Sequence, residues 1–92
     1  KLTRSGIEAF EAGDLAAAAA AFTEALEVVP NHSSVNLNLV QVLLKMYEVD
    51  PTNHQLLEQC RARLEHLQGL PEQHRQYRRY MALSQKLEGL NQ

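Results

Sequence analysis

The residues whose side chains could do chemistry are four histidines and one cysteine, and their spacing argues against a metal or catalytic site. No two histidines stand four residues apart, the separation that puts two ligands on one helical face, and Cys60 has no second cysteine to join it. Cys60 falls on the apolar side of a predicted helix, where a free cysteine behaves as a small hydrophobic residue. We therefore expect no metal, no cofactor and no catalytic residue, and a chain that is not an enzyme.

A cluster of arginines and tyrosines near the C-terminus is the one arguable nucleic-acid signal, because arginine and aromatic side chains together suit phosphates and bases. The cluster consists of Arg75, Arg78 and Arg79 with Tyr77 and Tyr80. The tyrosines are needed as packing residues, and a net charge of −2 provides little counterion release on binding a polyanion. A solvated basic face or a contact with an acidic partner is favoured, and nucleic acid is the weaker alternative.

Helices must position all of these residues. The sequence is 45% hydrophobic but only 5% aromatic, with leucine, valine and alanine dominating, which is a helical composition. Apolar residues recur at three-and-four spacing and never alternate over a long stretch. The pattern predicts an all-α domain over residues 1–92 with five helices, at about 2–12, 15–29, 33–48, 51–68 and 71–89.

Glycine, proline and capping residues separate these helices. Gly13 and Asp14 are a helix stop followed by an N-cap, and Pro30 ends the second helix. Ser33 or Ser34 is expected to cap the third helix, and Asp50 the fourth. The third helix is apolar on two sides, so it should be packed on two sides in the middle of the domain.

The first third of the chain resembles a tetratricopeptide repeat. The matching positions are Leu2-x-x-Ser5-Gly6-x-x-Ala9, Gly13-Asp14, Ala18-x-x-x-Phe22-x-x-Ala25 and Pro30. Gly6 and Ala18 would mark the close crossing of two helices, with Phe22 packing back onto the first. The resemblance implies antiparallel hairpins stacked in a short right-handed array: a repeat unit over 1–32, a degenerate helix pair over 33–69, and a capping helix over 70–92.

A looser resemblance concerns the last helix. Its Pro71 to Tyr80 segment, after one regular and one divergent hairpin, is similar to the C-terminal helical region of some bacterial response-regulator proteins. This would imply a bacterial signalling context. The chain starts at Lys1, which suggests an excised domain.

The repeat resemblance implies a protein–protein interaction module whose concave groove takes a peptide or protein partner. Its surface would be formed by residues of the first, third and fifth helices: Thr3, Ile7, Phe10, Glu11, Leu37, Asn38, Gln41, Leu44, Lys45, Arg75 and Arg78. A clamp for a C-terminal carboxylate is disfavoured, because Thr3 and Ile7 stand where that subtype has lysine and asparagine. The apolar residues suit an amphipathic helix or an apolar segment instead. The alternative is that they cover one another or lie under the last helix.

Self-association or intramolecular docking within a larger signalling protein is the second functional hypothesis. Terminal helix faces containing Leu2, Ala9 and Ala16 could seek a second copy, giving a homodimer, or a neighbouring domain. Residues 1–53 carry three basic and seven acidic residues, whereas 54–92 carry six basic and four acidic residues. This asymmetry could orient one molecule against another, or reflect small numbers. A single cysteine and no apolar run of roughly 20 residues favour a cytoplasmic protein without a membrane segment.

Overall fold

The computed structural model describes the backbone of residues 2–90 and the side chains of residues 3–90. It contains five α-helices: α1 (Leu2–Glu11), α2 (Leu15–Val28), α3 (Ser33–Val49), α4 (Gln55–Glu65) and α5 (Tyr77–Leu90). Over this range there is no β-strand. The expected all-α helical array is confirmed.

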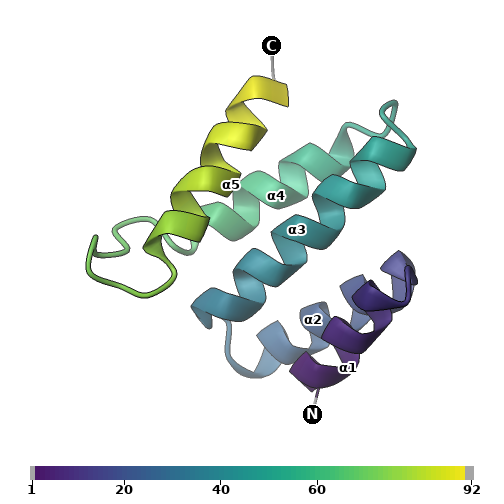
Figure 1. The fold of residues 1–92 in the computed structure, drawn as a ribbon, viewed down its shortest axis with the longest axis horizontal. Coiled ribbons are helices and arrows are strands. Elements are labelled where there is room, and N and C mark those ends of the chain that lie inside the picture. Colours follow the sequence, from purple (N-terminus) through teal and green to yellow (C-terminus); the bar gives the residue numbers. More distant parts are fainter. Residues whose placement is uncertain (1, 91–92) are drawn as a thin grey trace.

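Helix α3 occupies the centre of the array (Figure 1). It contacts each of the other four helices, while the α1–α2 hairpin contacts neither α4 nor α5 within the described residues. In Figure 1, α1, α3 and α5 lie towards the viewer, and α2 and α4 lie behind them. The two apolar sides of α3 are thus covered by different helices, as its sequence predicted.

The turn between α1 and α2 has the predicted chemistry. Gly13 adopts a φ of 83°, the left-handed conformation that glycine tolerates best. The Asp14 carboxylate then accepts a hydrogen bond from the backbone N–H of Ala17 at 3.1 Å, and so caps α2. This short turn folds α2 directly back onto α1.

Two predicted caps were wrong. The side chain that caps α3 is that of His32, whose Nδ1 accepts from the Val35 N–H at 3.3 Å, rather than that of Ser33 or Ser34. The imidazole nitrogen of His32 reaches an unpaired backbone N–H group in the first turn of α3, as the hydroxyl of a capping serine would.

Asp50 was expected to cap α4, but its carboxylate is already used within the loop. It accepts hydrogen bonds from the Thr52 hydroxyl at 2.6 Å and the Thr52 N–H at 3.3 Å. This local turn delays the start of α4 to Gln55.

The last helix begins later than predicted, at Tyr77 rather than near Pro71. In the preceding loop the Gln76 N–H donates to the Nδ1 atom of His74, two residues earlier, at 3.0 Å. The backbone N–H groups of His74 and Tyr77 donate to the carbonyl oxygens three residues earlier, those of Pro71 and His74. The side-chain hydrogen bond and the two backbone hydrogen bonds between residues three apart take the place of a first α-helical turn.

The core confirms the close approach of α1 and α2. Gly6, Ala18 and Phe22 are all buried. A Cβ atom built on Gly6 would lie 2.5 Å from the Cε1 atom of Phe22, well inside van der Waals contact. The absence of a side chain at Gly6 is therefore what lets the Phe22 ring pack this close to α1.

Cys60 belongs to the core, as predicted. Its side chain is fully buried, and its thiol donates weakly to the Val40 carbonyl oxygen at 3.9 Å. Desolvation by burial raises the pKa of the Cys60 thiol from 9.0 to about 11, and the positive charge of Arg61 opposes part of that shift.

We expect a thiol reagent to leave Cys60 unmodified in the native protein and to label it once the chain is unfolded in urea. We also expect the free energy of unfolding to fall as the pH rises from 9 towards 11. In that window the unfolded thiol loses its proton while the native thiol keeps it; below pH 9 the group has no effect on stability. The Cys60→Ala variant should lack this decline. Rapid labelling of the folded protein would contradict the assignment.

Candidate functional site

A cavity opens between α1 and α3 on the face that these helices share with α5. It has a volume of about 290 Å³ and is lined by Ile7, Phe10, Glu11, Phe22, Asn38 and Gln41. All of these except Phe22 were predicted from the sequence to form a binding groove. We call this feature the α1–α3 cavity.

One wall of the α1–α3 cavity is apolar and accessible. Ile7 is 40% exposed and Phe10 is half-buried, while Phe22 of α2 is almost fully covered and forms the floor. Glu11 is exposed at the rim. An isoleucine this exposed leaves apolar surface available to a ligand's side chain.

The opposite wall consists of the side-chain amides of Asn38 and Gln41, which are hydrogen-bonded to Arg79 of α5. The Nη2 atom of Arg79 donates to the Asn38 Oδ1 atom at 2.5 Å and to the Gln41 Oε1 atom at 2.7 Å. Because a guanidinium can only donate, both amide oxygens must turn towards Arg79. Both amide nitrogens are therefore left as donors, and within residues 2–90 neither has a partner.

Arg79 is a half-buried cation without a counterion. No carboxylate lies within ion-pair distance of it among residues 2–90. Desolvation by burial lowers the pKa of its guanidinium, although an arginine stays charged at neutral pH. Its field favours hydrogen-bond acceptors or anions on this face.

Two predicted groove residues lie in the core instead. Leu37 is 0% exposed and Leu44 is 2% exposed, so a ligand on this face could not touch them. Their prediction as accessible groove residues is corrected in favour of the alternative that these apolar side chains are covered. The reason is that α3 is packed by neighbours on most of its circumference.

The remaining predicted residues surround the face without lining the cavity. Thr3 is half-buried on α1, and the ammonium group of Lys45 is 3.7 Å from the Glu48 carboxylate on α3. Arg75 lies in the turn before α5, and Arg78 is exposed on its first turn. Arg79 is the residue of this cluster that meets α3.

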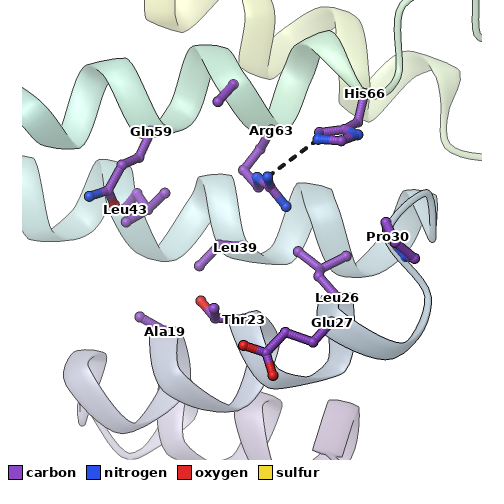
Figure 2. Close-up of a pocket in the computed structure, with 11 residues that line it drawn as sticks. Ala19, Thr23, Leu26, Glu27, Pro30, Leu39, Leu43, Gln59, Arg63 and His66 are labelled. Carbon is purple, nitrogen blue, oxygen red and sulfur yellow. Dashed lines mark hydrogen bonds between the residues drawn. The ribbon is translucent and has the colours of Figure 1, made fainter.

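A larger cavity lies on the opposite side of α3, in the space between α2 and α4 (Figure 2). It measures about 520 Å³. Helices α2 and α4 flank α3 without contacting each other in the described part of the chain. The buried Leu26, Leu39 and Leu43 form its floor, and it contains no residue that was predicted to bind. We call it the α2–α4 groove.

Polar groups close one end of the α2–α4 groove. Asn36 is fully buried, and its Nδ2 atom donates to the carbonyl oxygens of Pro30 and His32 at 3.0 Å each. Arg63 approaches the Asn36 Oδ1 atom at 3.5 Å and the His66 Nε2 atom at 3.3 Å, as Figure 2 shows for His66. These groups tie the α2–α3 turn to α4 and satisfy one another, which gives them a structural role.

No group of three or more metal-ligating side chains is gathered in residues 2–90. Within the same range no helix is long and apolar enough to span a bilayer.

The family comparison matches residues 9–51 to a model described as a tetratricopeptide repeat. This segment runs from the end of α1 to just beyond α3 and includes most of the α1–α3 cavity. Comparisons with curated proteins and with solved structures found no match. They give no support to the looser resemblance to bacterial response-regulator proteins.

Proposed function

We propose, from the match of residues 9–51 to a tetratricopeptide repeat, that the domain binds a peptide segment of a partner protein in the α1–α3 cavity without catalysing a reaction. Tetratricopeptide repeats generally mediate protein–protein interaction. The observation that carries the proposal is the convergence of Ile7, Phe10, Glu11, Asn38 and Gln41 on one cavity.

The two walls of the cavity favour a peptide over a small polar ligand. The accessible apolar wall of Ile7 and Phe10 suits one apolar side chain of the ligand. The oxygens of Asn38 and Gln41 are taken by Arg79, so the amide nitrogens of these two lining residues are the groups that remain to donate to carbonyl oxygens. An apolar side chain next to backbone carbonyls is the pattern of a peptide segment.

The test uses peptides selected from a displayed random library against the domain. We expect Ile7→Asp to weaken the selected peptide at least about tenfold, because a carboxylate would replace the apolar contact in a binding pocket. Ile7 is on the surface, so the fold should survive, and circular dichroism checks this. An aspartate at Leu44 would test stability instead of binding, since that side chain is buried.

The matched control is Val49→Asp. Val49 is an aliphatic residue that is 78% exposed at the end of α3, and it does not line the cavity. It should leave the peptide affinity unchanged. Equal losses in the two variants, or no loss in Ile7→Asp, would reject the α1–α3 cavity as the binding site.

A further inference from the structure

The charged residues of the domain are segregated between the two ends of the helical array. The α1–α2 hairpin, at one end, carries the exposed Glu8, Glu11, Glu24 and Glu27 and the capping Asp14 against one exposed base, Arg4. The opposite end presents the exposed Arg75 and Arg78 where α5 begins, with one exposed acid, Glu72, in the same loop. Helix α3 separates the hairpin from α5, and the two do not contact each other in the described residues. We call these the acidic end and the basic end.

The charges of both ends are uncompensated within the monomer. The ion pairs among residues 2–90 join Lys45 and Lys86 to Glu48, and Arg61 to Glu58. None of them involves the four glutamates of the acidic end or the two arginines of the basic end. Both ends therefore keep a net charge, negative at the acidic end and positive at the basic end, for an external contact.

Local helix stability does not explain these charges, because they oppose the helix dipoles. Glu27 lies in the last turn of α2, where the helix dipole is negative and a base would be favoured. Arg78 lies in the first turn of α5, where the dipole is positive and an acid would be favoured. The helix termini thus strengthen the negative potential of one end and the positive potential of the other.

Each end also exposes an apolar side chain beside its charges. Val28 is exposed four residues after Glu24, and Met81 is exposed three residues after Arg78. These spacings place each pair on one helical face. Protein–protein interfaces commonly have an apolar centre that excludes water and a polar rim where ions can pair. An exposed apolar residue beside charged residues fits that arrangement.

We propose that the acidic end of one molecule docks on the basic end of a second copy, so that the domain associates head to tail. A two-fold dimer through either end would bring like charges together, because such an interface places the same patch against itself. The head-to-tail arrangement instead pairs Glu24 and Glu27 with Arg75 and Arg78 of the next copy. This inference is independent of the peptide-binding function, since the α1–α3 cavity contains none of these four residues.

The test begins with sedimentation of the full chain from micromolar to millimolar concentration. At about 0.01 M salt, where the Debye length is about 30 Å, the mean mass should rise steadily with concentration. It should have no fixed end point, because a heterologous contact that does not close forms open chains. At about 1 M salt, where the Debye length is about 3 Å, the chain should sediment as a monomer.

Charge reversal then identifies the surfaces. Glu24→Lys/Glu27→Lys reverses the charge that α2 presents at the acidic end, and Arg75→Glu/Arg78→Glu reverses the charge of the basic end. Each variant alone should associate at least about tenfold more weakly than the wild type, because attractive pairs become repulsive ones. An equal mixture of the two should recover association, since each then offers the end that the other lacks. Lysine near the end of α2 and glutamate near the start of α5 suit the helix dipoles, so both variants should fold.

The control is Glu65→Lys/Glu72→Lys, which changes the net charge by the same amount as Glu24→Lys/Glu27→Lys but leaves the sign of both ends as it was. It should associate at least as well as the wild type. A wild-type chain that stays monomeric at low salt would overturn the proposal. So would association that survives in the reversed variants, or a mixture that fails to recover it.

Discussion

Replacing Gly6 with valine is expected to lower the free energy of unfolding by about 3 kcal/mol. A Cβ atom at this position would already lie 2.5–2.8 Å from three ring carbons of Phe22, and valine adds two methyl groups beyond it. The ring is nearly fully buried, so it cannot move aside without disturbing the core. Chemical denaturation of the purified variant measures the change.

Gly89 supplies the control for this substitution. It is also within a helix, but a Cβ atom there would meet nothing within 4 Å. Gly89→Val should be neutral or slightly stabilising, because valine has a somewhat better helix propensity than glycine. The double variant Gly6→Val/Phe22→Ala should show strong coupling between the two positions. Equal effects of valine at both glycines would show that α1 and α2 do not cross closely at Gly6.

Replacing Asn36 with alanine is expected to cost about 2–3 kcal/mol of stability. The buried side-chain amide donates to two carbonyl oxygens of the α2–α3 turn, those of Pro30 and His32. The His32 oxygen keeps a second partner, the backbone N–H of Asn36, but the Pro30 oxygen loses the donor shown here. The cost comes from losing the hydrogen bonds of a fully buried amide and from the space that its removal leaves in the core.

Asn53→Ala is the corresponding control, because Asn53 is exposed in the loop before α4. Its effect should stay within about 0.5 kcal/mol. If Asn36→Ala were equally mild in thermal and chemical denaturation, the α2–α3 turn would not depend on this side chain.

The sequence was sufficient to predict the elements whose determinants are local or periodic. The turn at Gly13 and Asp14 follows from conformational preference and capping chemistry, and both occur as expected. The two apolar faces of α3 predicted its central position, and Gly6 with Phe22 predicted the close crossing of α1 and α2. Each of these signals depends on residues within one or two neighbouring helices.

The errors in the fold concern side chains that compete with the backbone. Asp50 has the residue type of an N-cap, but Thr52 supplies nearer donors and keeps it in the loop. Pro51 and Pro71 are both tolerated in a first helical turn, yet neither begins a helix. After Pro71, the side chain of His74 accepts a hydrogen bond from the Gln76 N–H and holds the segment as a loop. Residue preference alone does not decide such competitions.

The errors in the candidate site come from burial. Leu37 and Leu44 have the residue types of a groove wall, but whether a leucine on α3 is open or covered depends on where the other helices pack. Arg75 and Arg78 were predicted to lie on the groove and Arg79 was not, although the spacing of residues along the last helix indicates the position of Arg79. It stands four and eight residues before Leu83 and Leu87, which places it on the packing side of α5.

The α1–α3 cavity and the α2–α4 groove lie on different sides of α3, so their use by a ligand can be told apart. The most direct measurement is the change in backbone and arginine side-chain NMR shifts when a selected peptide is added to ¹⁵N-labelled protein. Binding in the α1–α3 cavity predicts the largest changes at Ile7, Phe10 and Gln41 and at the side chain of Arg79. Changes confined to Thr23, Gln59, Ala62 and His66, which line the α2–α4 groove, would contradict the account.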